Sequence, residues 1–336
     1  MRTALLALVL AGGAYAAVEG TVVNGTTGKA QSNAEVSLLK LGGAGMEPVG
    51  SVKADAQGRF RIESSEPGPQ LLQAVHDGVT YNQMLTPGSP TTGVTLEVFD
   101  ASAKAGAAKV SQHMVVLEPG DSQLAVSESV IFQNGGKLSF NDAENGTLRV
   151  YLPEGANQTR VSATAPHGVP LERTADKTNE HNVYKIDFPI KPGETRIDVS
   201  YVVPFTNPGT FRGKVLQRDT PVRLVVPPGV SLKGAGLQSL GQEPQTKAAI
   251  YGVKGREYSV EIQGTGTLRG GQQEAGDDSG SSLDQILPKV YDKVYWIVGL
   301  GLAVLFAGFL LLYRSSTNQT TAATPLAAAS KDKRRS

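Results

Sequence analysis

The sequence predicts an all-β protein, with exported β-sandwich domains, a flexible stalk and one C-terminal transmembrane helix. Three observations predict this organisation. Apolar and polar residues alternate over much of the chain, which is typical of half-buried strands. The 336 residues include 39 Gly and 19 Pro, which favour the turns that join short strands. An uninterrupted apolar segment near the C-terminus is long enough to cross a bilayer.

The composition narrows the class of function. Lys and Arg number 32 against 31 Asp and Glu, so the net charge of +1 predicts no attraction to nucleic acid. The chain has no cysteine, which excludes disulfides, thiolate zinc sites and thiol nucleophiles. An exported protein without disulfides is more typical of a bacterial envelope than of animal secretion.

Residues 1–16 are predicted to be a secretory signal peptide. Arg2 supplies the positive charge, residues 4–11 form a short apolar stretch, and residues 14–16 read A-x-A, a cleavage motif. The stretch is too short to span a bilayer alone. We therefore expect an exported chain that begins at Ala17.

Residues 17–100 are predicted to form a seven-stranded β-sandwich, because short alternating segments are separated by turn sequences such as EPGP and TPGSP. In DAQGRFRI, Asp55 is expected to accept hydrogen bonds from turn amides and Gly58 to adopt positive φ. A calcium loop would need several more oxygen ligands, so the favoured interpretation is a hairpin bend. The expected strands are 18–24, 34–41, 49–55, 59–64, 70–77, 79–86 and 93–100.

This segment resembles the carboxypeptidase-regulatory-like family, whose pattern is V-x-G-x-V, a T-G turn, D-x-x-G-x-F and a later strand that ends in a His/Gly turn. A tyrosine-like position of the family is Leu71 here. The resemblance implies a transthyretin-like (prealbumin, carbohydrate-binding-like) sandwich that serves as an accessory module on exported proteins. It implies no catalytic site, because the matched residues are turn and core positions. The turn and core positions are Gly20, Gly28, Asp55, Gly58, Phe60 and Gly78.

Residues 101–108 are expected to be a small-residue linker, and residues 109–268 a second β-rich ectodomain of one or two sandwiches. In this region Ile197, Val199 and Tyr201 alternate with polar residues, as in a strand with one buried face. The strand-like segments are 123–134, 146–155, 159–166, 182–190, 194–205, 221–232, 247–253 and 257–264.

A stalk and a membrane helix are predicted to follow. Residues 269–293 are expected to be a flexible stalk, since their first half is rich in Gly, Ser and charged residues and too poor in apolar ones to fold. Residues 294–313 carry no charge and match the roughly 30 Å core of a bilayer as one helix. Trp296 lies near one end of this helix, as aromatic side chains at a membrane interface do.

The flanking charges predict the orientation of the helix. The tail, residues 314–336, carries five Lys or Arg and one Asp, so it is expected in the cytoplasm. The predicted location is the inner (plasma) membrane, single-pass, with the ectodomain outside. Gly299, Ala303 and Ala307 fall at intervals of four and form a small-residue surface that permits close helix packing.

Motifs for catalysis, cofactors or metals are missing from the sequence. It contains neither G-x-S-x-G nor H-E-x-x-H. The histidines, His76, His113, His167 and His181, are expected on the solvated surface. A zinc site assembled across loops is left open without sequence support. We therefore expect no enzyme activity, no cofactor and no metal.

The expected function is that of a membrane-anchored protein whose exported domains bind or scaffold a protein partner in the envelope. The alternative is binding of a glycan or peptidoglycan, which the carbohydrate-binding-like resemblance suggests. Sugar sites often stack on exposed aromatic rings, and alternation places most of the candidate tyrosines in the core. A peptidase is less favoured, because regulatory-like modules accompany a metallopeptidase domain that this sequence lacks. The candidate tyrosines are Tyr81, Tyr151, Tyr184, Tyr251 and Tyr258.

The predicted orientation can be tested with protease added to cells whose outer envelope has been opened. Cleavage is expected within residues 269–293, because a stalk without a packed core is an open substrate. An epitope fused after residue 336 should stay protected, as immunoblotting would show. A protected stalk, or digestion of the epitope in sealed cells, would contradict the orientation.

Overall fold

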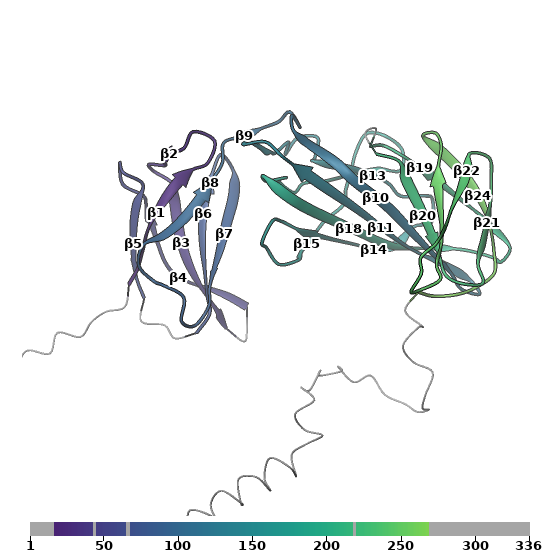
Figure 1. The fold of residues 1–336 in the computed structure, drawn as a ribbon, viewed down its shortest axis with the longest axis horizontal. Helices are drawn as coiled ribbons and strands as arrows, with labels where there is room; N and C mark the ends of the chain where they lie inside the picture. The colour runs from purple at the N-terminus through teal and green to yellow at the C-terminus, as the bar shows by residue number, and fades with distance from the viewer. Residues whose placement is uncertain (1–16, 43–44, 65–67, 218–219, 269–336) are drawn as a thin grey trace, which may run out of the picture. The chain divides into compact units, whose positions relative to one another are not determined.

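The computed structural model describes residues 17–42, 45–64, 68–217 and 220–268, which contain only strands, turns and loops (Figure 1). The all-β fold class is therefore confirmed. The predicted signal peptide, stalk, transmembrane helix and tail lie outside the described residues. Within those residues, no helix has the length and apolar character needed to cross a membrane.

The first sandwich consists of β1 (Ala17–Asn24), β2 (Lys29–Ala30), β3 (Glu35–Gly42), β4 (Gly45–Lys53), β5 (Arg59–Glu63), β6 (Gln70–His76), β7 (Val79–Leu85) and β8 (Val94–Val98). In one sheet, β1 pairs antiparallel with β2 and β5 and parallel with β8. The other sheet has the antiparallel order β4-β3-β6-β7. Both sheets contribute to one core, in which Val22, Leu38 and Leu72 are fully buried. The alternation of the sequence thus corresponds to an inner and an outer face on each sheet.

The bend at residues 55–58 joins the two sheets. Asp55 Oδ1 accepts hydrogen bonds from the backbone N–H groups of Gln57, at 2.9 Å, and Arg59, at 2.8 Å. The backbone hydrogen bond from Arg59 is the main cause that lowers the pKa of Asp55. Because β4 and β5 belong to different sheets, the segment is an arch, and the predicted hairpin is wrong. Turn chemistry is local, whereas the choice of strand partner is not.

The other matched motif residues also occupy turns and the core. Gly28, Gly58 and Gly78 have φ angles of 71°, 72° and 74°. Phe60 is 5% exposed. A Cβ on Gly20 would lie 2.1 Å from the backbone oxygen of Val94, so β1 and β8 can approach here only at a glycine.

The second sandwich consists of β10 (Ala108–Pro119), β11 (Gln123–Asn134), β13 (Leu148–Tyr151), β14 (Asn157–Thr164), β15 (Leu171–Arg173), β16 (Asp176–Lys177), β17 (Val183–Ile186), β18 (Gly193–Pro204), β19 (Gly209–Lys214), β20 (Val222–Val226), β21 (Ser231–Lys233), β22 (Leu237–Gln242), β23 (Ala249–Val253) and β24 (Glu257–Gln263). The order β15-β14-β18-β11-β10-β20-β23-β22 forms an eight-stranded sheet. Two three-stranded sheets, β13-β17-β16 and β19-β24-β21, complete it. Residues of all three sheets, among them Leu117, Ile186 and Ile262, share one hydrophobic core.

The alternation predicted for residues 194–205 is confirmed in β18. Ile197, Val199 and Tyr201 are buried, whereas Arg196, which precedes them, is exposed and the residues between them are only partly buried. The strand therefore lies with one face on the core and one face toward solvent.

Strand β10 is not among the predicted strands, and a β-bulge explains why. Its register against β11 shifts between Val110 and Gln112, which leaves Ser111 as an extra residue. The bulge places Val110 and His113 on the same inner face although they are an odd number of residues apart. The period of two is thereby broken in the sequence.

The chain passes from the first sandwich to the second through a short strand. β9 (Ala101–Ser102) pairs in parallel with β12 (Ser139–Phe140). The Ser139 N–H donates to the Asp100 backbone oxygen at 2.9 Å. The predicted linker at residues 101–108 therefore begins as a paired strand.

The assignment of the first core can be tested with a matched pair of leucines in neighbouring strands. Leu72→Ala should lower the free energy of unfolding by about 2–5 kcal/mol, because it leaves a cavity at a fully buried site. Leu41→Ala should change it by about 0.5 kcal/mol or less, because Leu41 is 40% exposed. Urea unfolding followed by circular dichroism measures both. Equal losses would contradict the assigned core.

Candidate functional site

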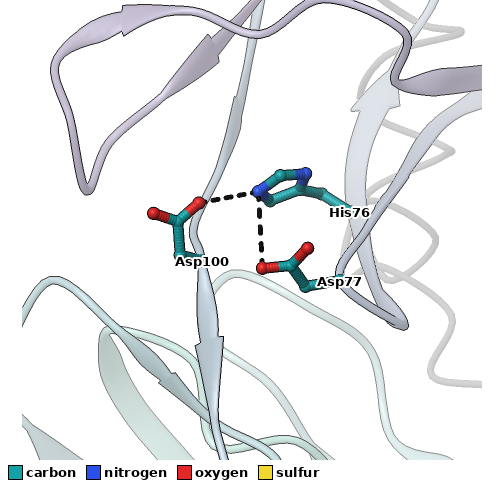
Figure 2. A group of neighbouring side chains, drawn as sticks. All are labelled: His76, Asp77 and Asp100. Atoms are coloured by element: carbon teal, nitrogen blue, oxygen red, sulfur yellow. Dashed lines mark hydrogen bonds and ion pairs between the residues drawn. The ribbon is translucent and has the colours of Figure 1, made fainter.

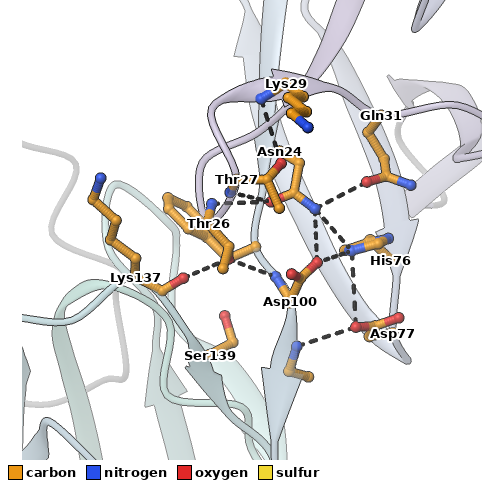
Figure 3. Close-up of polar contacts among 12 residues, drawn as sticks. Asn24, Thr26, Thr27, Lys29, Gln31, His76, Asp77, Asp100, Lys137 and Ser139 are labelled. Atoms are coloured by element: carbon orange, nitrogen blue, oxygen red, sulfur yellow. Dashed lines mark hydrogen bonds and ion pairs between the residues drawn. The ribbon is translucent and has the colours of Figure 1, made fainter.

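A cluster of polar side chains lies where the first sandwich leads into β9. We call Asn24, His76, Asp77 and Asp100 the junction cluster (Figures 2 and 3). Asn24 ends β1, His76 ends β6 with Asp77 directly after it, and Asp100 follows β8. The two sheets of the sandwich therefore bring residues from distant parts of the chain to one end.

His76 lies at the centre of this cluster. Its Nε2 is 2.8 Å from Asp100 Oδ1 and 3.8 Å from Asp77 Oδ2, as Figure 2 shows. The Asn24 amide donates to Asp100 Oδ1 at 2.7 Å. Asn24 is 4% exposed and the His76 side chain 14%, whereas the side chains of Asp77 and Asp100 are 49% and 34% exposed. The amide and imidazole of the cluster are thus buried, whereas its two carboxylates are accessible to solvent.

The hydrogen bond with His76 is the main cause that lowers the pKa of Asp100. The hydrogen bond from Asn24 lowers it further. Asp100 is therefore an anion at neutral pH, and His76 Nε2 carries the proton of their shared hydrogen bond.

A tight turn fixes the position of Asp77. The turn between β6 and β7 consists of Asp77, with φ of 48°, and Gly78, with φ of 74°, and His76 pairs with Val79 across it. Positive φ at both turn residues is the pattern of a type I′ hairpin turn, which Asp-Gly favours. Asp77 Oδ2 also accepts a hydrogen bond from the Ala101 N–H at 3.2 Å, so this turn is tied to the start of β9.

Asn24 orders the loop on the other side of the cluster (Figure 3). Its Oδ1 accepts hydrogen bonds from the N–H groups of Thr26, at 2.9 Å, and Thr27, at 3.1 Å. Thr26 Oγ1 accepts from the Asp100 N–H at 2.9 Å and donates to the backbone oxygen of Lys137. The orientation of the Asn24 amide is therefore fixed on both of its polar atoms.

Lys191 and Tyr81 form a second contact between the sandwiches. Tyr81 Oη is 2.8 Å from Ser139 Oγ, and Lys191 Nζ donates to the Thr80 backbone oxygen. Lys191 Nζ also lies 5.0 Å from the centre of the Tyr81 ring, a cation–π distance. Burial lowers the pKa of Lys191 to about 8, and the nearby charge of Arg173 adds to this shift.

His113 is buried, so its predicted place on the solvated surface is wrong. It is 3% exposed, and its Nε2 lies 2.6 Å from Oε1 of Glu128, which is 9% exposed. Its Nδ1 has no partner among the described residues. Burial raises the pKa of Tyr201 and of Tyr258, and the charge of Glu128 adds to both shifts. The adjoining cavity of about 10 Å³ has room for about one water, so it cannot take a larger ligand.

The remaining histidines differ in their surroundings. His167 and His181 are exposed, as predicted. His76 is mostly buried and hydrogen-bonded, so the predicted solvated position is wrong for it too. The relevant signal in the sequence is that the strands predicted at 70–77 and 93–100 both end in aspartate. That signal becomes a cluster only when the strand order is known.

An open groove of about 580 Å³ lies on the second sandwich. Its lining includes His167, Pro192, Arg196 and Asp198. Arg196 Nε donates to both carboxylate oxygens of Asp198, at 2.9 Å and 2.8 Å. The two charges therefore satisfy each other, and the groove offers neither to a ligand.

The outer face of the β4-β3-β6-β7 sheet carries large apolar side chains. Leu41, Met46, Val75 and Met84, which we call the outer apolar face, are 40%, 46%, 43% and 41% exposed. Leu41 pairs with Met46, and Met84 pairs with Leu71 in the strand that also carries Val75. Leu72 and Ala74 of β6 face the core, so Leu71 and Val75 lie on the opposite face of the sheet. Met84 shares that face with its cross-strand partner Leu71.

The comparisons with known proteins identify no family for this chain. The chain matches no protein-family model and no curated protein. The crystal structure of an M1 zinc metallopeptidase from Deinococcus radiodurans is similar to it at 13% identity and a TM-score of 0.26. The crystal structure of a two-domain M1 zinc metallopeptidase mutant bound to L-arginine is similar at 13% identity and a TM-score of 0.27. Each similarity covers 46% of this chain and 42% of the other. The chain thus spans less than half the length of these structures, and we draw no argument from the likeness.

The burial of Lys191 predicts a pH dependence of stability. Burial penalises the charged amine in the folded state, and this cost is full below the folded pKa of about 8. This cost disappears as the pH rises past 10.5, the usual pKa of lysine, because Lys191 is then neutral in the unfolded chain as well. Between about pH 8 and pH 10 this residue should therefore raise the free energy of unfolding by about 2 kcal/mol.

Urea unfolding at these two pH values, compared between the natural chain and Lys191→Met, measures this contribution. The rise should be smaller by that amount in the variant, which keeps an unbranched apolar side chain over Tyr81. Parallel pH profiles of the two proteins would contradict the burial of the charge.

Proposed function

We propose that this chain is a non-enzymatic, membrane-anchored envelope protein whose exported β-sandwiches bind a protein partner. The observation that carries the proposal is the outer apolar face. Large apolar side chains gathered on one exposed surface mark interaction sites, because their contact with water is unfavourable until a partner covers them. On an ordinary sheet the solvated face is polar, and covering it with a partner would remove little apolar surface from water.

The proposed anchoring combines export with a membrane span. The signal peptide would export the ectodomain, and residues 294–313 would hold it in the inner membrane with the basic tail in the cytoplasm. The stalk at residues 269–293 would let the sandwiches reach a partner at a variable distance from the bilayer. A transthyretin-like first module is part of the same proposal, and such modules serve as accessories on exported proteins.

The alternative of glycan binding has less support. Tyr81 is 4% exposed and Tyr258 9%, so neither ring offers a free face to a sugar. A protein partner is favoured because the exposed apolar residues are aliphatic or methionine side chains, which pack against other side chains. Glycan binding remains an outcome that the experiment below distinguishes.

The proposal is tested by crosslinking in intact membranes, followed by capture of the full chain. We expect a defined protein to be recovered with the natural chain. The double variant Leu41→Asp and Met84→Asp should recover it at least about tenfold less well, because two desolvated contacts are replaced by charges. The matched control is Leu240→Asp in β22, whose side chain is 51% exposed on the second sandwich.

Equal recovery with all three proteins would contradict binding through the outer apolar face. Retention of the ectodomain on peptidoglycan, unchanged in the double variant, would favour the glycan alternative. Hydrolysis of a peptide that a chelator abolishes would contradict the non-enzymatic part of the proposal.

A further inference from the structure

The junction cluster has the geometry of a metal site. His76 Nε2, one oxygen of Asp77 and one oxygen of Asp100 all lie within 4.8 Å of one another. Nitrogen and oxygen ligands of tetrahedral Zn²⁺ lie about 2.1 Å from the ion, which places them about 3.4 Å apart. The distances from Nε2, 2.8 Å and 3.8 Å, bracket this separation. Figure 2 shows that the three side chains face one another, so small side-chain movements would bring their ligand atoms around one ion.

The charge of the cluster also favours a cation. The salt bridges of Asp77 and Asp100 within the described residues both go to the same imidazole. Two carboxylates thus share one group whose charge is at most a single unit, and the set is left negative. A divalent ion between the two carboxylates would neutralise this negative charge. A hydrogen bond from a neutral amide cannot do so, because the amide carries no net charge.

The surrounding groups hold the carboxylates in place. The Asn24 amide donates to Asp100 Oδ1, and the Ala101 N–H donates to Asp77 Oδ2. Groups of this kind orient ligands around bound metals and raise the affinity of the site. Asn24 is itself nearly inaccessible to water and fixed by two backbone N–H groups, so this support exists before an ion binds.

We propose that His76, Asp77 and Asp100 bind one divalent transition-metal ion of the Zn²⁺ type at the exit from the first sandwich. One imidazole and two carboxylates suit Zn²⁺, Mn²⁺, Co²⁺ or Fe²⁺, whereas Ca²⁺ takes six to eight oxygen ligands. The partly exposed carboxylates leave a further position to water. The ion joins the β6–β7 turn to the start of β9, and it does not depend on the proposed partner.

Binding requires a change at His76 that can be observed. Nε2 lies 2.8 Å from the oxygen of an anionic Asp100, which can only accept, so Nε2 is inferred to carry a proton; a ligating Nε2 must instead present a lone pair. A neutral His76 therefore moves its proton to Nδ1 when the ion binds, and a protonated one releases a proton to solvent. Nitrogen NMR of the imidazole distinguishes these states.

The proposal is tested on the full chain, purified in detergent, stripped with a chelator and titrated with Zn²⁺ or Co²⁺ by calorimetry. We expect one ion per chain. His76→Ala and Asp77→Asn should each weaken binding by about tenfold or more, as loss of a ligand does. Asn accepts positive φ, so Asp77→Asn should preserve the turn and the melting temperature of the ion-free protein. His181→Ala, which removes an exposed histidine elsewhere, is the matched control.

Three further results decide the proposal. At the same Zn²⁺ concentration, the melting temperature of the natural chain and of His181→Ala should rise by more than that of Asp77→Asn. Absent binding, or binding that His181→Ala weakens as much as His76→Ala does, would overturn the proposal. The double variant Leu41→Asp and Met84→Asp should bind the ion normally, so failure of the proposed partner surface and failure of the metal site are distinguishable.

Discussion

The hydrogen bond between Asp100 and His76 determines where the chain leaves the first sandwich. Asp100 follows β8 in one sheet, and His76 ends β6 in the other, so their contact joins the two sheets at one end. A hydrogen bond to a charged group stabilises more than a neutral one, and solvent screening reduces this contribution at the partly exposed Asp100. With Asp100 held in this way, its backbone oxygen accepts from Ser139, and β9 begins beside β12. The order of the junction thus depends on a side-chain contact within the first sandwich.

This constraint separates two surfaces with different chemistry on the same small domain. The outer apolar face lies on the β4-β3-β6-β7 sheet, where exposed aliphatic and methionine side chains suit a protein partner. The junction cluster lies at the end of the strands, where carboxylates converge on one imidazole and suit a cation. The second sandwich contributes a polar core around His113 and Glu128, whose adjoining cavity has room for about one water. The two proposed activities therefore use different side chains with different chemistry, although Val75 of the outer apolar face directly precedes His76 on β6.

The sequence allowed the strands of the first sandwich to be located, because alternation and turn chemistry are local properties. Non-local pairing explains what it missed. The bend at Asp55 was predicted as a hairpin because its sequence does not reveal that β4 and β5 pair with other strands. The burial of His113 was missed because the bulge at Ser111 breaks the alternation within β10, and no strand was predicted there. His76, Asp77 and Asp100 form a cluster only because β8 lies parallel to β1 and beside Asn24.

The most direct test of the junction as an ion-binding site is a crystal structure of the zinc-loaded chain, with anomalous scattering measured at the zinc edge. Our account predicts one peak among the three side chains, about 2.0–2.2 Å from His76 Nε2 and from an oxygen of Asp77 and of Asp100. An occupied zinc at an exposed histidine such as His167 or His181, with the Asp100–His76 hydrogen bond unchanged, would contradict it.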